Sequence, residues 1–262
     1  MGSYRDYESL LTDLTDRGVL TATLDRPERL NAFDGPLRRS IRRLIDDVAT
    51  DDDVRVLVLT GAGRGFCSGA DLTAEDRSPV PVAAHEPAFG WCADLLQLPK
   101  PTIAAINGLA VGGGLGLALL CDVRLCSTEA RLLPIWLKRA IHPDDLITWT
   151  LPRAVGLARA MEWLYLAEDI PLDDALAAGM INAVVEADAL APTAAEMAER
   201  MAAMPPMHLA LTKQSVLANQ TREPWDAALI ESWGQNKALS SEDFKEGVAA
   251  FRDRRPPQFQ GR

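Results

Sequence analysis

Two stretches decide the fold: VLTGAGRGFCSGADL (58–72) and PTIAAINGLAVGGGLGLALLCDVRL (101–125). Each begins with a short apolar run that predicts a strand buried on both faces, and each run leads into a cluster of glycines. The second cluster continues into LGLALL, which we expect to be a buried helix. Strands that end in glycine turns and lead into helices are typical of α/β proteins with a mainly parallel sheet.

The same alternation continues outward from these stretches. Val19–Leu24 alternates in hydrophobicity and is followed by Arg-Pro, which predicts a strand running into a turn. Apolar residues at helical spacing predict a helix over 34–48, and the polar, proline-bearing stretch 73–86 predicts a loop. The C-terminal part is rich in Ala and Met and reads as helical almost to its end. We therefore expect an α/β core over 1–192 and a helical appendage over 193–262.

Composition excludes several classes of protein. Of the 262 residues, 48% are hydrophobic and 24% charged, as in ordinary globular proteins. The net charge of −10 disfavours a nucleic acid or an anionic membrane as partner. The N-terminal stretch is acidic, unlike a signal peptide, so we expect a cytoplasmic protein. The four cysteines lack metal-ligand spacing, and we expect free, buried thiols without a metal or redox cofactor.

The glycine clusters fit none of the common glycine-rich motifs. A dinucleotide-binding G-x-G-x-x-G would need glycine at Phe66 or Leu117, and no Gly-Lys-Ser/Thr marks a P-loop. Ser68 is not centred in G-x-S-x-G, so a nucleophile elbow also lacks support. Two readings remain open. The clusters are either tight turns or a pair of turns whose backbone N–H groups converge on one oxygen as an oxyanion hole.

At this level of detail the sequence resembles the crotonase superfamily, the enoyl-CoA hydratase/isomerase family. The matching motifs occur in the family's order and cover nearly the whole chain: 24–33 (LDRPERLNAF), 58–72, 101–125, 153–185 and 242–262. The resemblance implies a spiral of ββα units with a C-terminal helical appendage. It also implies an acyl-CoA thioester as substrate, with coenzyme A as part of that substrate, and assembly into a homotrimer or a hexamer made of two trimers.

The resemblance also implies particular site residues. The two N–H donors that would stabilise an enolate are those of Ala70 and Gly113. A further set is expected to contact coenzyme A: Arg26, Arg29, Leu30, Ser68, Ala70, Asp71, Leu72, Phe251 and Arg254. Arginine is suited to the phosphates because its guanidinium matches phosphate oxygens, although surface arginines also form weak ion pairs. Phe251 and Arg254 lie where the family's last helix covers coenzyme A, sometimes that of a neighbouring subunit.

The chain departs from the family at both glutamates that typical hydratases use as acid/base groups. The corresponding positions carry Gly116 and Trp136, neither of which can exchange a proton with water. Asp144 lies eight residues after the second position, where dienoyl-CoA isomerases of this superfamily carry a catalytic aspartate. We expect Asp144 to be the acid/base group, with Gly116, Trp136 and His142 at the acyl pocket. The alternatives are that Asp144 or Asp145 caps the following helix, and that Trp136 only fills space.

The reaction itself stays open at this stage. An enolate held by Ala70 and Gly113 serves hydration, double-bond isomerisation and hydrolysis. Proton transfer by Asp144 fits isomerisation best, whereas activation of water by Asp144 fits hydration or hydrolysis. The aspartate and tryptophan positions also match 4-chlorobenzoyl-CoA dehalogenases, but the aromatic residue and histidine of that family correspond here to Ala70 and Phe89. A non-catalytic acyl-CoA-binding protein is the remaining alternative.

Overall fold

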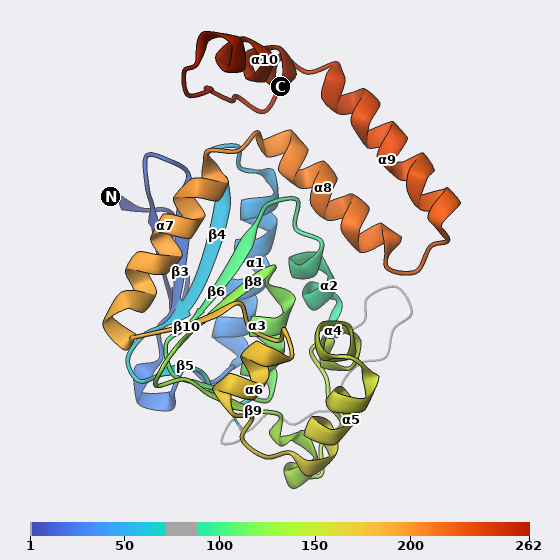
Figure 1. Cartoon of the computed structure of the whole chain (residues 1–262). Coiled ribbons are helices and arrows are strands. Elements are labelled where there is room, and N and C mark those ends of the chain that lie inside the picture. Colours follow the sequence, from blue (N-terminus) through green and yellow to red (C-terminus); the bar gives the residue numbers. More distant parts are fainter. Residues whose placement is uncertain (1, 72–87) are drawn as a thin grey trace.

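The computed structural model describes residues 2–71 and 88–262, and its centre is a seven-stranded sheet (Figure 1). In sheet order the strands are β1 (Gly2–Ser3), β2 (Leu10–Leu14), β3 (Val19–Leu24), β4 (Val56–Gly61), β6 (Thr102–Ile106), β8 (Val123–Ser127) and β10 (Ala183–Val185). The first two pairings are antiparallel, and every pairing from β3 onward is parallel. The mainly parallel sheet predicted from the buried strands is confirmed. The loop expected over 73–86 lies outside the described residues.

A second, smaller parallel sheet repeats the order of the first. It contains β5 (Gly65–Cys67), β7 (Leu109–Val111) and β9 (Arg131–Leu133), which directly follow β4, β6 and β8. The chain thus alternates between the two sheets as it advances. Helix α2 (Gly90–Leu96) precedes β6, and α3 (Gly113–Leu120) links β7 to β8. This is the expected spiral of strand pairs and helices.

Helices cover both faces of the large sheet. On one face, α1 (Gly35–Thr50) begins where the Asp34 carboxylate accepts a hydrogen bond from the Leu37 N–H, and it buries an apolar stripe. On the same side, α3 is buried along its whole length. On the opposite face, α7 (Leu190–Ala202) packs small side chains against β3, β4, β6 and β8. The expected boundary at 192/193 falls inside this helix, whose small side chains pack on the core.

The helices after α7 extend away from the core. Helices α8 (Pro206–Asn219) and α9 (Pro224–Leu239) pack side by side, and α10 (Glu242–Asp253) follows at the far end (Figure 1). They expose large apolar side chains: Trp225, Leu229, Trp233, Phe244 and Phe251. The exposed rings are compatible with the expected trimer, which stays a prediction. No helix of residues 2–71 and 88–262 is both long and apolar enough to cross a membrane.

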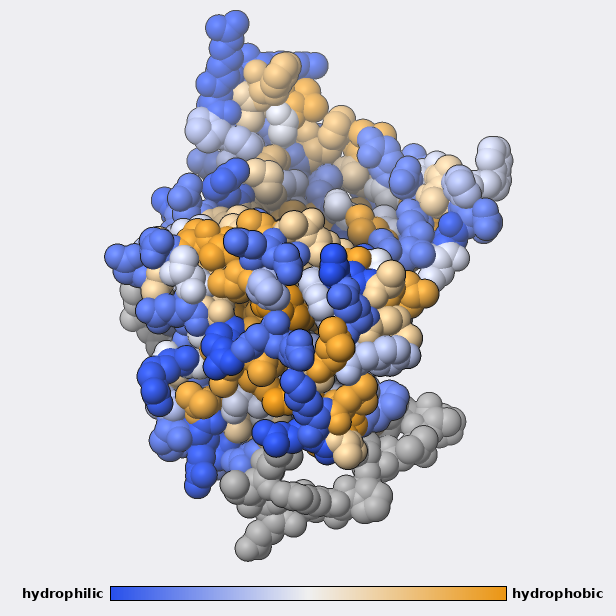
Figure 2. Space-filling model, turned by 60° about the horizontal axis from the view of Figure 1, so that its bottom comes forward, coloured by the Kyte–Doolittle hydropathy of each residue, from blue (hydrophilic) through white to orange (hydrophobic). Residues whose placement is uncertain are grey.

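Three shorter helices, α4 (Ile147–Val155), α5 (Leu157–Leu166) and α6 (Leu172–Ala177), join β9 to β10. They lie at the end of the molecule opposite α10 (Figure 1). Apolar side chains are visible among polar ones on the face that this end presents (Figure 2). Helix α5 exposes several of its apolar residues: Leu157, Met161, Tyr165 and Leu166.

Asn31 joins the loop after β3 to the crossing from β4 to β5. Its side chain is fully buried and its φ is +57°, a backbone conformation that asparagine tolerates better than most residues. The amide donates to the carbonyls of Ala62 and Gly65, at 2.9 and 2.8 Å, and accepts from the Arg26 N–H at 2.9 Å. One side chain therefore satisfies three buried backbone groups at the point where the chain changes sheets.

Replacing Asn31 with alanine leaves these three backbone groups without their partner and places alanine at a positive φ. We expect Asn31→Ala to lower the free energy of unfolding by about 2–4 kcal/mol. Denaturant titration measures this loss. Asn182→Ala is the control, because Asn182 is exposed and its side chain accepts a single backbone hydrogen bond from Arg124. An equal loss in both variants would contradict the role given to Asn31.

Candidate active site

The two glycine turns lie against each other. Gly69 has φ +81°, and a Cβ built on it would lie 2.7 Å from the Val111 carbonyl oxygen and 3.1 Å from the Gly113 nitrogen. A Cβ on Gly114 would lie only 2.0 Å from the Cys67 carbonyl oxygen. A side chain at either position is therefore excluded. The glycines predicted from the sequence to form turns bring the two backbones into direct contact.

The two predicted donors, Ala70 and Gly113, belong to these turns. The loop before Ala70 is fixed by the Phe33 N–H, which donates to the Gly69 carbonyl at 2.7 Å, and by the Asp71 N–H, which donates to the Phe33 carbonyl at 2.9 Å. Gly113 is the first residue of α3, where backbone N–H groups are unpaired and the helix dipole is positive. Within the described part of the chain, neither the Ala70 nor the Gly113 N–H has a hydrogen-bond partner. The two turns can thus offer two N–H donors to an oxygen that gains negative charge.

Beside these turns lies the buried carboxyl of Asp145, which the sequence left open as a helix cap. Its side chain is 2% exposed. Its Oδ2 lies 2.5 Å from the position of a Cβ on Gly113, and its Cβ lies 2.8 Å from that of a Cβ on Gly116. Gly113 and Gly116 are one helical turn apart, so their missing side chains leave the space that Asp145 occupies. The Cys92 Sγ, 3.7 Å from Oδ1, is a weak donor on the other side.

Asp144 is held by Trp136. The indole is 4% exposed, and its Nε1–H donates to Asp144 Oδ1 at 2.7 Å. The ring therefore fills space, as one reading expected, and also orients the carboxylate. The alternative that an aspartate caps the next helix is wrong, because α4 begins after Leu146 and no side chain caps it. Positive φ values at Asp145 and Leu146, +50° and +57°, instead turn the chain so that Asp145 points inward.

The charge state of Asp145 follows from this environment. The pKa of Asp145 is raised from its ordinary 3.8 to about 7, and burial is the largest cause of this shift. The neighbouring Asp144 contributes to the shift by its charge and through a hydrogen bond, while Arg38 and the hydrogen bond with Cys92 oppose it. Burial also raises the pKa of the Cys67 thiol to about 12 and that of Cys92 above its usual range. Neither thiol is thus prepared to act as a nucleophile at neutral pH.

Several residues expected at coenzyme A lie together beside the Ala70 turn. The Ser68 N–H donates to the Leu30 carbonyl at 3.0 Å, and the Ser68 hydroxyl donates to the Arg29 carbonyl at 3.2 Å. Arg26 is nearby, but its guanidinium is already engaged. It pairs with Asp34 at 3.1 Å and Asp71 at 3.2 Å and donates to the Ala32 carbonyl. Its role in this chain is to fix the loop, which leaves it poorly placed to bind a phosphate.

Other expected site residues are exposed or lie outside the described part of the chain. Phe251 is 86% exposed and, like Arg254, belongs to the end of α10, on the far side of the molecule from α5 (Figure 1). His142 is exposed, and no hydrogen bond or ion pair in the described ranges involves it. Leu72 lies outside the described residues.

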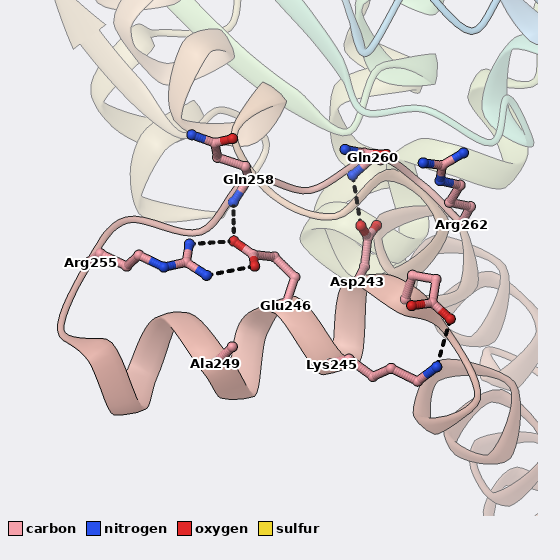
Figure 3. Close-up of a pocket in the computed structure, with 9 residues that line it drawn as sticks. Asp243, Lys245, Glu246, Ala249, Arg255, Gln258, Gln260 and Arg262 are labelled. Atoms are coloured by element: carbon pink, nitrogen blue, oxygen red, sulfur yellow. Dashed lines mark hydrogen bonds and ion pairs between the residues drawn. The ribbon is translucent and has the colours of Figure 1, made fainter.

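A hollow between α10 and the C-terminal tail is a different kind of feature (Figure 3). Its polar groups bind one another. Arg255 donates two hydrogen bonds to Glu246, at 2.6 and 2.8 Å, and lowers the pKa of that carboxyl to about 2. The Gln258 N–H donates to Glu246, and the Gln260 N–H donates to Asp243. These bonds fold the tail back onto α10, so we regard the hollow as structural.

Comparison with known proteins agrees with this geometry. The family model described as enoyl-CoA hydratase/isomerase matches residues 15–262. The 1,2-epoxyphenylacetyl-CoA isomerase of Escherichia coli is 38% identical, over 94% of this chain and 97% of that protein. The (E)-benzylidenesuccinyl-CoA hydratase of Thauera aromatica is also 38% identical, over 93% and 96%. A putative enoyl-CoA hydratase structure from Streptomyces coelicolor superposes with a TM-score of 0.91 at 30% identity, covering 100% of this chain and 98% of that one. The predicted fold class and the resemblance seen in the sequence are confirmed.

Removing the indole N–H tests whether Trp136 holds Asp144. Trp136→Phe keeps an aromatic ring but leaves Asp144 Oδ1 without its donor, so we expect the free energy of unfolding to fall by about 1–3 kcal/mol. Denaturant titration at neutral pH gives the value. Trp149→Phe is the control, since that indole donates no hydrogen bond among the described residues and lies against Arg153. A smaller loss in Trp136→Phe than in the control would count against the contact.

The raised pKa of Asp145 predicts how stability depends on pH. Between about pH 4 and 7 the native state holds a proton that the unfolded chain releases, so this residue makes stability decrease as pH rises through that range. Asp145→Asn cannot ionise. Its stability relative to the parent protein should therefore increase from pH 4 to 7 and stay constant above. Denaturant titrations at a series of pH values test this, and a difference that is independent of pH would refute it.

Proposed function

The chain belongs to the enoyl-CoA hydratase/isomerase family, whose enzymes act on acyl-CoA thioesters, and from this premise we propose that it isomerises an acyl-CoA through an enolate. The observation that carries the proposal is the position of the Asp144 carboxylate, which accepts a hydrogen bond from the Trp136 N–H at 2.7 Å. Asp144 is followed directly in the sequence by Asp145, which lies against Gly113. A base is thus placed next to a turn that can stabilise negative charge.

The proposed reaction transfers one proton. The Ala70 and Gly113 N–H groups bind the thioester carbonyl oxygen, which lowers the cost of removing a proton from a carbon conjugated with it. Asp144 takes that proton, and the electron pair moves onto the carbonyl oxygen as an enolate. The protonated Asp144 then returns the proton to another carbon of the same conjugated system. The double bond shifts, and neither water nor a further cofactor is consumed.

Isomerisation suits this residue set better than hydration by two glutamates does. Gly116 and Trp136 stand where the typical hydratase carries its acid and its base, and neither side chain can exchange protons with water. A single well-oriented carboxylate can both remove and return a proton. The relative from Escherichia coli, 38% identical, is named an isomerase of an epoxyphenylacetyl-CoA, which supports isomerisation of an acyl-CoA as the type of reaction.

The acyl group is proposed to carry an aromatic ring. The names of the two relatives described above refer to acyl groups built on a six-membered carbon ring: a benzylidene group in one and an epoxidised phenyl ring in the other. In this chain Phe33 and Trp91 form an edge-to-face pair with centroids 6.3 Å apart. Phe33 Cε2 lies 3.1 Å from the position of a Cβ on Gly113, so the pair adjoins the oxyanion turn. An aromatic acyl group can pack against such rings.

Hydration of the double bond is the second candidate. The relative from Thauera aromatica is named a hydratase, and Asp145 provides a second carboxyl next to Asp144. The products separate the two reactions, because hydration adds the mass of one water and isomerisation leaves the mass unchanged.

Substrate contacts and assembly complete the proposal. We place the coenzyme A moiety along Arg29, Leu30 and Ser68, whose backbones are joined by hydrogen bonds. Phe251 and Arg254 reach such a site only from a neighbouring subunit, so they depend on the expected trimer or hexamer. No cofactor besides the coenzyme A of the substrate is proposed.

Asp144→Asn tests the proposed base. The amide cannot accept the proton, so kcat/KM for an enoyl-CoA with an aromatic acyl group should fall by about 10²–10⁴-fold. Affinity for the thioester, measured by isothermal titration calorimetry, should stay within about threefold, because the N–H donors are unchanged. Asp94→Asn, on the exposed face of α2, controls for the change in charge. Full turnover in Asp144→Asn would remove this residue from the mechanism.

A further inference from the structure

The space that a carboxylate at position 116 would enter is already filled by a carboxyl from another element. Helix α3 carries Gly116, and a Cβ there would come within 2.8 Å of Asp145 Cβ and 3.4 Å of the Asp145 carbonyl oxygen. Asp145 belongs to the loop before α4, adjacent in sequence to Asp144. The glycine on one element and the aspartate on the other are therefore complementary in shape.

The groups that face Asp145 provide little compensation for a second negative charge. From α1, the Arg38 guanidinium lies over the Phe33 ring, 5.4 Å from its centroid, and attracts the Asp145 charge from a distance. From α2 and β5, Cys92 and Cys67 offer only neutral thiols. From its own loop, Asp144 adds a like charge. Two adjacent carboxyls in such a place have a much lower free energy with one proton between them than when both are ionised.

We propose that Asp145 is a positioning residue that holds one proton beside Asp144, so that the two carboxyls work as a dyad in the acyl-CoA reaction. This inference rests on the proposed function of the site. Neutral Asp145 donates to Asp144 and steadies it as the base. It also keeps negative charge away from Gly113, since Asp145 Oδ2 lies 2.5 Å from the Cβ position of that residue. The shared proton on this carboxyl pair thus takes over the acid/base role that typical hydratases divide between two glutamates.

The proposal predicts a particular pH dependence. Once the second proton leaves, Asp145 places a negative charge next to the N–H that is to bind the enolate oxygen, and that charge opposes enolate formation. Because this ionisation occurs at about pH 7, turnover should decline above it. Below that pH the dyad keeps its proton and the reaction proceeds.

The first experiment compares kcat between about pH 5 and pH 9 for the parent protein, Asp145→Asn and the control Asp94→Asn. We expect the parent and the control to lose about tenfold per pH unit above neutrality, as for loss of a single proton. Asp145→Asn should be several-fold slower at pH 6, because an amide is a weaker donor, but its alkaline decline should be absent. An alkaline decline that persists unchanged in Asp145→Asn, or is absent from the parent, overturns the proposal.

The second experiment does not depend on turnover. Protein labelled with ¹³C at the aspartate carboxyls is titrated by NMR. One carboxyl should titrate near neutral pH in the parent, be missing in Asp145→Asn, and move to lower pH in Asp144→Asn, where the neighbouring charge is gone. A resonance that stays in Asp145→Asn, or does not move in Asp144→Asn, overturns the dyad.

The two experiments also separate failure of this inference from failure of the proposed function. Full activity in Asp144→Asn would end the proposed isomerase mechanism, and the NMR titration would still decide whether the carboxyls share a proton. Inactive Asp144→Asn together with an unaltered pH profile in Asp145→Asn would keep the proposed function and reject the dyad.

Discussion

The close contact of the two glycine turns is the constraint on which the rest of the site depends. Gly69 lies against Val111 and Gly113, and Gly114 lies against the Cys67 carbonyl, at distances that leave no room for a Cβ. This contact joins the end of β5 to the start of α3, and so ties the small sheet to the buried helix. It also brings the Ala70 and Gly113 turns together. The donors that these turns offer are backbone N–H groups and not side chains.

Absent side chains decide the chemistry as much as those that are present. Without a Cβ at Gly113 and Gly116, one face of α3 is left open, and Asp145 and Phe33 occupy it. A carboxyl placed there is buried beside the Cys92 thiol, and burial therefore dominates its pKa. In our proposal Gly116 takes the place of a family glutamate, and its missing side chain then provides the space for a different acid group.

Much of the fold could be predicted from the sequence because it depends on local patterns. An alternating pattern marked Val19–Leu24 as a strand and a buried apolar run marked Thr102–Ile106, and the glycine clusters marked the turns that follow strands. The inward turn of Asp145 could not be predicted, since it depends on positive φ values at two consecutive non-glycine residues, Asp145 and Leu146. Without those angles, an aspartate before a helix is read as a cap. Likewise, the ion pair of Arg26 with Asp71 joins residues 45 positions apart in the sequence, and no local pattern predicts it.

Loss of the family's usual carboxylates does not by itself imply loss of catalysis. What an enolate reaction needs is a base within reach, donors for the developing charge, and no uncompensated negative charge beside those donors. In our proposal Trp136 takes the place of one family glutamate, and its N–H fixes the Asp144 carboxylate. Gly116 takes the place of the other, and its missing side chain admits Asp145. Both replacements therefore act on one carboxyl pair, which argues that the two changes belong to a single rearrangement of the site and not to its decay.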